Sequence, residues 1–271
     1  MSEDMLIDCH VHLDSYSDSE VSEVLERGRN VGVAFVISAG TTIPSTERSI
    51  ELSDKFPDFF SGVGIHPMDI TEPFDDNTYA RLRDLALQNE KVIVVSETGL
   101  DFMEDAPDRA IQYTAFREQI GLARELGYPI VFHSRESHDE VFRLLREERG
   151  YEVGGVMHYF QGDLNDAKRA IDLGFYISLA RPLLRYTYLQ EVAAAVPLDN
   201  IVLETDAAPQ PFKAKRENWT EPRHTRIVAE RLAELQGKTV EEIEAVTSRN
   251  IRKMLGDRWE VVQRHVAVDM Q

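Results

Sequence analysis

Short apolar runs alternate along the chain with longer segments that carry charged residues. The apolar runs are rich in β-branched residues, as buried strands of a parallel sheet are. The segments between them place apolar residues at helical spacing, for example Phe116, Ile120 and Ala123. We therefore predict repeated strand–helix units, with strands at residues 5–10, 34–39, 60–65, 92–97, 129–133, 155–158, 175–178 and 201–204.

Eight such units favour one closed (β/α)₈ barrel, a TIM barrel, over an open doubly wound sheet. An open sheet is expected to carry a glycine-rich phosphate loop after its first strand, whereas residues 8–12 here read Asp-Cys-His-Val-His. Near the end, apolar residues at 228, 232 and 235 predict an eighth helix. Thr239 and Glu242 then form a capping box that opens another helix, ending at about Leu255.

The length of 271 residues fits a single domain over residues 1–271, with a core at about 5–256 and an appended tail at 257–271. The tail carries Trp259, Val261, Val262 and Val266, which predict an extra C-terminal helix packed on the barrel, or else a surface that covers a neighbour.

Composition indicates a folded protein that does not span a membrane. The chain is 42% hydrophobic with a mean hydropathy of -0.34, and it has no apolar run long enough for a transmembrane helix. An acidic start and a single cysteine, Cys9, favour the cytoplasm and exclude an internal disulfide or a cysteine-based zinc cluster within the chain. We expect Cys9 to be a small buried apolar residue.

The formal charge is -18, from 48 acidic and 30 basic residues, which excludes a basic DNA-wrapping protein. Only 7 of the basic residues are lysines, a composition typical of proteins that work in concentrated salt. At ~1 M salt the Debye length falls to roughly 3 Å, so local groups rather than net charge would decide which substrate binds.

Histidines and acidic residues gather at the predicted strand ends, where a barrel enzyme carries its active site. Imidazole and carboxylate are ligands for Zn²⁺, Mn²⁺ and similar ions. Because these residues occur together at five or more strand ends, we predict a metal centre. Its candidate residues are His10, His12, His66, Glu97, His133, His158 and Asp206.

Each of these residues also has a simpler interpretation. His10 and His12 are two apart and face the same side of a strand, but such a pair can also face solvent. Glu97 ends an apolar run, where its carboxylate could bridge two ions, cap the next helix or pair with an arginine. His133 and His158 could be core histidines bonded to backbone carbonyls.

Asp206 is the candidate general base, because a carboxylate there could take a proton from water activated by a metal. Its alternative role is the N-cap of the following segment. Glu204, two residues earlier, is expected to orient a ligand histidine rather than bind metal itself.

Six short motifs occur in order between residue 5 and about residue 256. They are Asp8-x-His10-x-His12-Leu13-Asp14, Gly64-x-His66-Pro67, Glu97-x-Gly99-Leu100-Asp101, His133-x-Arg135, His158-x-Phe160 and Glu204-Thr205-Asp206. In this combination the chain resembles the TatD family of metal-dependent deoxyribonucleases. The resemblance implies the amidohydrolase-like barrel and two divalent ions, Mg²⁺, Mn²⁺ or Zn²⁺.

The resemblance also implies two ligand sets that share Glu97. The first set is His10, His12, Glu97 and Asp206. The second set is Glu97, His133 and His158. By the same resemblance, His66 and Arg135 would meet the substrate phosphate or the activated water, with Glu97 and Asp206 as the catalytic residues.

The segment after the eighth strand departs from the family pattern. Residues 206–209 read Asp-Ala-Ala-Pro, which delays the usual proline by one residue, and residues 218–222 lengthen the family's N-x-P element. Both changes concern specificity rather than the metals. Lys213, Lys215 and Arg216 form a basic cluster in this segment, which is either a solvated face or a contact to a phosphate backbone.

We therefore predict a metal-dependent hydrolase of ester bonds that cleaves DNA, acting on single strands or ends. The alternatives are a small-molecule hydrolase of an ester, lactone or amide, which the acidic composition favours, and a barrel that only binds a partner. No obligate protein partner is expected.

Overall fold

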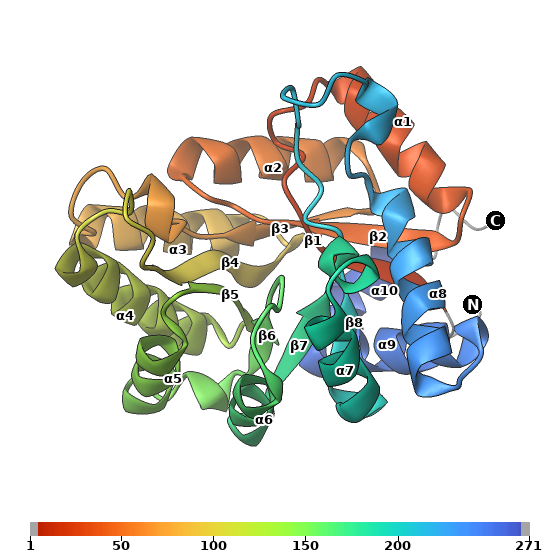
Figure 1. Ribbon diagram of the computed structural model, residues 1–271. Coiled ribbons are helices and arrows are strands. Elements are labelled where there is room, and N and C mark those ends of the chain that lie inside the picture. The colour runs from red at the N-terminus through yellow and green to blue at the C-terminus, as the bar shows by residue number, and fades with distance from the viewer. Residues whose placement is uncertain (1–4, 267–271) are drawn as a thin grey trace.

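The computed structural model describes residues 5–266, and within them eight parallel strands form a barrel surrounded by helices (Figure 1). The strands pair in sequence order: β1 (Leu6–Val11), β2 (Val33–Ser38), β3 (Phe59–Val63), β4 (Val92–Asp101), β5 (Ile130–Arg135), β6 (Gly155–Met157), β7 (Phe175–Leu179) and β8 (Ile201–Leu203). The predicted (β/α)₈ barrel is thereby confirmed.

A helix follows every strand, as the alternating pattern predicts. The helices that follow β1 to β8 in turn are α1 (Asp18–Arg29), α2 (Ile43–Lys55), α3 (Asp76–Gln88), α4 (Arg109–Leu126), α5 (His138–Glu147), α6 (Leu164–Asp172), α7 (Thr187–Ala195) and α8 (Thr225–Gln236). Two more helices, α9 (Val240–Leu255) and α10 (Trp259–Val266), complete the described chain. The predicted capping box of α9 is present, with Thr239 accepting from the backbone N–H of Glu242.

Hydrogen bonds between the end of β1 and the residues that follow β8 close the barrel. The N–H of Asp206 donates to the carbonyl oxygen of His10 at 3.0 Å, and the N–H of His12 donates to the carbonyl oxygen of Ala207 at 2.7 Å. Val11 and Ala207 form a parallel bridge at the same place. The seam therefore runs through the residues that the sequence assigns to the metal centre.

Alternate strand residues build two hydrophobic layers. One layer packs the outer strand face against the surrounding helices, and its members include Leu6, Phe59, Ile130, Met157 and Ile201. The other fills the barrel interior, and its strand members include Ile7, Phe60, Val131, Val156 and Val202. Cys9 lies buried in this interior layer, as expected of a small apolar residue.

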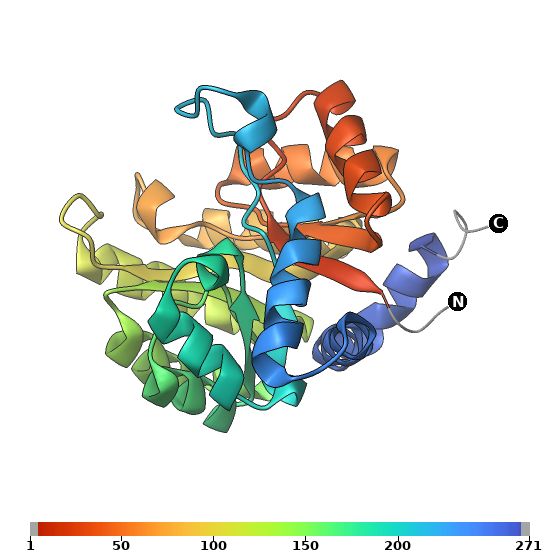
Figure 2. The same ribbon diagram turned by 45° about the vertical axis from the view of Figure 1, so that its right-hand side comes forward.

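The C-terminal helix α10 covers the interior layer at the end of the barrel where β1 begins. Trp259, Val261, Val262 and Val266 are buried against the interior residues of the strands. Figure 2 shows α10 beside the N-terminal start of β1, on the opposite side of the barrel from the carboxyl ends of the strands. The packed terminal helix predicted from the sequence is thus present, although residues 267–271 of the tail lie outside the described part of the chain.

Strand β4 extends four residues beyond its predicted end at Glu97 and reaches Asp101. Gly99 permits this extension, because its φ is +134° and a Cβ atom there would overlap the carbonyl oxygen of His133 on β5. The sequence pattern stops earlier because Glu97, Thr98 and Gly99 interrupt the apolar run. Among the described residues, no helix is long and apolar enough to cross a bilayer.

Candidate metal centre

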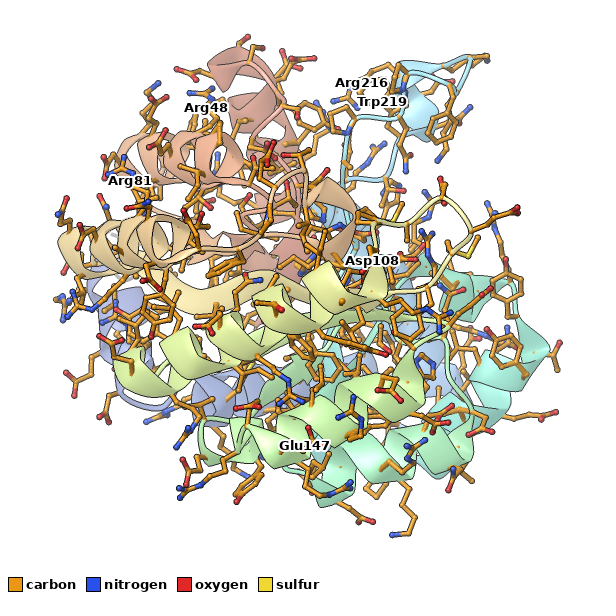
Figure 3. The ribbon with its side chains drawn as sticks, turned by 90° about the vertical axis from the view of Figure 1, so that its left-hand side faces the viewer. Arg48, Arg81, Asp108, Glu147, Arg216 and Trp219 are labelled. Carbon is orange, nitrogen blue, oxygen red and sulfur yellow. The ribbon has the colours of Figure 1, made fainter. Side chains whose placement is uncertain are left out.

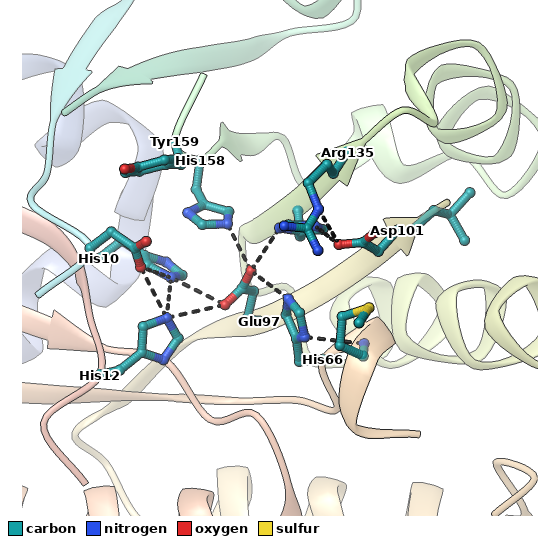
Figure 4. Close-up of polar contacts among 12 residues, drawn as sticks. His10, His12, His66, Glu97, Asp101, Arg135, His158 and Tyr159 are labelled. Atoms are coloured by element: carbon teal, nitrogen blue, oxygen red, sulfur yellow. Dashed lines mark hydrogen bonds and ion pairs between the residues drawn. The ribbon is translucent and has the colours of Figure 1, made fainter. Parts of the chain in front are cut away.

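His10 and His12, at the end of β1, point their imidazoles to one place. Their Nε2 atoms are 3.1 Å apart, and each lies 3.3 Å from Oε2 of Glu97. Oδ1 of Asp206 lies 3.2 Å from Nε2 of His12 and 3.9 Å from that of His10. Two imidazoles and two carboxylates thus converge on one point at the barrel seam (Figure 4).

Glu97 stands at the centre of the cluster and is only 2% exposed. While its Oε2 atom faces the histidines of β1, its Oε1 atom faces a different set. Oε1 lies 2.7 Å from Nε2 of His158, 3.2 Å from Nε2 of His66 and 3.3 Å from Nδ1 of His133. One carboxylate therefore serves two groups of imidazoles, one on each oxygen (Figure 4).

Several buried atoms of this cluster have no hydrogen-bond partner in the described structure. Nε2 of His158 lies close to Glu97 but not in hydrogen-bonding geometry, and Nδ1 of both His158 and His10 is also unpartnered. Buried polar atoms without a partner are rare in folded proteins. Imidazole nitrogens and carboxylate oxygens that converge in this way are a set of donor atoms that fits a cation.

The contact made by one ring nitrogen of a histidine determines whether the other ring nitrogen can bind a metal ion or donate a hydrogen bond. Nε2 of His133 lies 2.8 Å from the carboxylate of Asp101 and therefore carries the proton. The lone pair of its Nδ1 atom then points toward Glu97. Nδ1 of His66 instead accepts from the backbone N–H of Met68 at 3.1 Å, which places the proton on Nε2. His133 can therefore act as a metal ligand, whereas His66 presents a donor.

Asp101 is a residue that the sequence motif contains but to which we assigned no role. It is fully buried and holds both His133, at 2.8 Å, and Nε of Arg135, at 2.8 Å. The signal was available, because Glu97, Gly99 and Asp101 have the even spacing of one strand face. The predicted strand ends at Glu97, so Gly99 and Asp101 fall outside it and the shared face is missed.

The end of β8 is held by a second pair of buried acids. Asp8 accepts from the N–H of Thr205 at 2.9 Å and from its hydroxyl at 2.5 Å, so its carboxylate is engaged away from the histidines. Glu204 accepts from the N–H of Tyr159 at 2.7 Å and lies 3.5 Å from Nδ1 of His158. Glu204 thus lies beside a histidine of the cluster, and its role in orienting that histidine stays a prediction.

Three residues that follow the strands adopt a left-handed backbone. The φ angles are 54° for Glu136, 46° for Tyr159 and 55° for Asp206, a region that residues other than glycine seldom occupy. These residues follow β5, β6 and β8 at the same rim. Such strained positions cluster at functional sites, where the surrounding structure holds them in place.

Charges inside the cluster stabilise one another in the absence of a cation. Burial would lower the pKa of His12, but the carboxylates of Asp206 and Glu97 raise it to about 10. Burial opposes ionisation of Asp206, yet the hydrogen bond and charge of His12 lower its pKa to about 2. The cluster therefore holds protons between its carboxylates, and a metal ion would compete for the same positions.

A cavity of about 640 Å³ opens above the cluster. It is lined by all but one of the residues that the sequence assigned to the site, the exception being the deeply buried His10. The lining residues from that set are His12, His66, Glu97, His133, Arg135, His158 and Asp206. Tyr159, Gln161 and Tyr188 also line it and were not predicted. They come from segments after β6 and β7 whose sequence carries no pattern of its own.

Comparison with known proteins identifies the family. The model of the TatD related DNase family matches residues 7–256. The chain belongs to the TatD related DNase family. It is therefore a metal-dependent hydrolase, and the DNase family is one that acts on ester bonds.

Relatives match the TatD-family chain over nearly its full length. The metal-dependent hydrolase YabD of Bacillus subtilis is 33% identical over 92% of this chain and 98% of its own. The TatD protein of Edwardsiella piscicida, named as a 3′-5′ ssDNA/RNA exonuclease, is 30% identical over 87% of this chain and 93% of its own.

Solved structures agree with the barrel. The TatD homologue YjjV of Escherichia coli is 28% identical, with a TM-score of 0.84 over 92% of this chain and 97% of its own. An amidohydrolase from Saccharomyces cerevisiae, only 17% identical, shares the fold with a TM-score of 0.80 over 93% of this chain and 99% of its own. The amidohydrolase-like fold is thus confirmed.

Proposed function

We propose that this TatD-family chain is a phosphodiesterase that cleaves DNA at single strands or ends, using a pair of divalent ions. One observation carries the proposal: the two oxygens of Glu97 face two separate groups of imidazoles. A carboxylate in that position can be shared by two ions. The exonuclease name of the Edwardsiella relative supports a nucleic-acid substrate.

The proposal assigns two ligand sets, as the family resemblance implies. The first would be His10, His12, Glu97 and Asp206. The second would be Glu97, His133 and His158. When bound, divalent ions such as Mg²⁺, Mn²⁺ or Zn²⁺ would lower the pKa of water and stabilise negative charge that develops on a phosphoryl oxygen.

Asp206 would act as the general base. Its side chain is 31% exposed and lines the cavity, so a substrate-side water can reach it. Its pKa, which His12 lowers to about 2, keeps the carboxylate ionised at neutral pH. The barrel seam fixes its backbone next to His10, so the carboxylate stays beside the ligand imidazoles.

Arg135 and His66 would bind the substrate phosphate. Asp101 accepts from Nε of Arg135, which orients the guanidinium while the half-exposed side chain reaches the cavity. A guanidinium can donate two parallel hydrogen bonds to a phosphate. His66 lines the same cavity, with its Nε2 atom 3.2 Å from Glu97, so both groups would reach a phosphoryl oxygen of a substrate bound there.

A small-molecule ester, lactone or amide is the second candidate substrate. The cavity volume of about 640 Å³ lies within the range of pockets that enclose small ligands. Its residues would perform the same proton transfer, because the chemistry of the metal centre does not depend on the size of the substrate.

The deciding assay compares substrates on one preparation of the full chain. Single-stranded DNA, duplex DNA, a small phosphodiester and a carboxylate ester would be tested with Mn²⁺ or Mg²⁺, at low and high salt. We expect metal-dependent cleavage of single-stranded DNA that is absent from the Asp206→Asn variant. Rapid hydrolysis of the carboxylate ester without any cleavage of DNA would contradict the proposal and favour the small-molecule candidate.

A further inference from the structure

A second hollow, with a volume of about 170 Å³, adjoins the metal-centre cavity. Tyr159 and Gln161 line both spaces, so the two are neighbours along one surface. The second hollow is lined by three cationic side chains, Arg181, Arg185 and Lys213. We call it the basic hollow. Its cations come from two segments, one after β7 and one after β8.

The three cations of the basic hollow have no carboxylate partner among the described residues. Arg181 donates to the hydroxyl of Thr220 at 3.0 Å, and Lys213 donates to Oε1 of Gln210 at 2.6 Å. Both partners are neutral. This is unusual in a chain of charge -18, where most basic side chains nearby are paired with acids.

Glu221 illustrates the contrast. It follows Thr220, which lines the basic hollow, and it pairs with Arg27 at 2.8 Å, Arg216 at 3.0 Å and Arg223 at 3.2 Å. Arg216 also stacks over the ring of Trp219, 4.3 Å from its centroid, on the segment after β8 (Figure 3). In the segment after β8, Arg216 and Arg223 are therefore paired with a carboxylate, whereas Lys213 is bonded only to neutral groups.

Burial and the neighbouring positive charges lower the pKa values of Arg181 and Lys213. Burial first, and then Arg185, lower the pKa of Arg181, and burial followed by Arg181 and Arg185 lowers that of Lys213. The pKa of His224 also falls to about 4, through burial and then the charges of Arg181 and Arg223. An uncompensated cluster of like charges is costly unless an anion binds it.

Two tyrosines connect the basic hollow to the metal-centre cavity. The rings of Tyr186 and Tyr188 stack with centroids 5.8 Å apart and an interplanar angle of 30°. Tyr186 lines the basic hollow and Tyr188 lines the metal-centre cavity, and the two side chains are 46% and 45% exposed. Exposed aromatic rings beside a cationic groove are the features that bind single-stranded nucleic acids.

We propose that the basic hollow binds a backbone phosphate adjacent to the phosphodiester that the metal centre cleaves, and that a base of the same strand stacks on Tyr186 and Tyr188. This inference rests on the proposed function and specifies it: the substrate is a polynucleotide strand rather than a mononucleotide or a small ester. Lys213 would then contact a phosphate backbone, whereas its neighbour Lys215, 3.6 Å from Glu217, belongs to the solvated face.

The test measures steady-state cleavage of a single-stranded oligonucleotide and of bis(p-nitrophenyl) phosphate, a diester that has no second phosphate to place in the basic hollow. The Arg185→Ala/Lys213→Ala double variant would be compared with the wild type and with Lys215→Ala as a matched control. We expect KM for the oligonucleotide to rise about tenfold or more, and the log–log salt slope to fall by about 0.7, the value for one backbone phosphate of a single strand that is no longer neutralised. Hydrolysis of the small diester should change less than twofold.

A second variant, Tyr186→Ala/Tyr188→Ala, tests the aromatic platform without altering charge. It should raise KM for the oligonucleotide by about 5- to 100-fold and leave the salt slope unchanged. Unchanged KM values in both variants, or equal losses on both substrates, would overturn the inference and leave the proposed function intact. A wild-type protein that hydrolyses the small diester but not DNA would instead refute the proposed function, and the inference with it.

Discussion

The backbone N–H of Asp206 donates to the carbonyl oxygen of His10 at 3.0 Å, across the seam where β8 meets β1. One hydrogen bond therefore both closes the barrel and places the candidate base beside a candidate ligand. His12 and Ala207 repeat the contact at 2.7 Å. Because fold and centre share these bonds, a change that opens the seam should remove activity before it removes the rest of the fold.

Asp206→Asn tests the general base. Asparagine tolerates the left-handed backbone at this position and keeps the seam hydrogen bond, so the variant should remain folded, with a thermal unfolding midpoint lowered only by the lost contact with His12. Turnover should fall by about 10²- to 10⁴-fold, the usual contribution of general acid–base catalysis. Near-normal kcat in a folded variant would show that Asp206 is not the base.

Glu97→Ala tests the shared carboxylate. Both ligand sets include Glu97, so its removal should abolish stoichiometric binding of Mn²⁺ or Zn²⁺ rather than merely halve it. Metal content measured after dialysis checks this, with Glu147→Ala as control, since Glu147 forms surface ion pairs with Arg117 and Arg143. Full metal occupancy in Glu97→Ala would contradict the shared position.

Asp101→Asn tests the residue behind His133. Loss of the carboxylate weakens the orientation of both His133 and Arg135, and substitutions behind a metal ligand typically cost 10- to 100-fold in metal affinity or activity. Competition with a chelator gives the metal affinity directly. Asp139→Asn is the control, because Asp139 pairs with Arg169 on the surface. Equal metal affinities in the two variants would rule out this positioning role.

Metal binding should strengthen as pH rises. The pKa of His12 without metal is raised to about 10, so this imidazole is protonated throughout the neutral range. A metal must displace that proton, and affinity should increase about tenfold per pH unit for each proton released. Calorimetric titration in two buffers of different ionisation enthalpy counts the protons. Affinity independent of pH between 6 and 9, with no proton release, would show that the cluster is not protonated in this way.

Gly99→Ala tests the close approach of β4 and β5. The φ of +134° and the overlap of a Cβ atom with His133 should destabilise the protein by more than the about 1–3 kcal/mol of backbone strain alone. Gly121→Ala, inside α4 with open space around its Cα, should instead stabilise by about 0.5–1 kcal/mol. Denaturant unfolding of the two variants distinguishes these effects, and similar stabilities would contradict the close approach.

Apolar periodicity was sufficient to predict the barrel, because buried parallel strands leave runs that end within one or two residues of the observed ends. Strand β4 shows where this reasoning stops. Two of its last residues, Gly99 and Asp101, have low strand propensity and are extended where β5 pairs with them. Tertiary pairing there overrides local preference.

The candidate site could be predicted as a set of residues but not as a geometry. The histidines and acids of the site can be predicted because they follow the predicted strands, and a barrel brings the ends of its strands together. Which nitrogen of His66 or His133 faces Glu97 depends on the contacts that these histidines make with Met68 and Asp101. Those contacts are known only once the chain is folded. The basic hollow was equally hidden, since Arg181 and Lys213 meet only through the fold and Lys213 looks no different in sequence from Lys215.

The most direct test of the metal centre is anomalous diffraction from crystals of the full chain soaked with Mn²⁺. The shared position of Glu97 predicts two peaks, one among His10, His12 and Asp206 and the other beside His133 and His158. Strong peaks located elsewhere, with none adjoining Glu97, would contradict it.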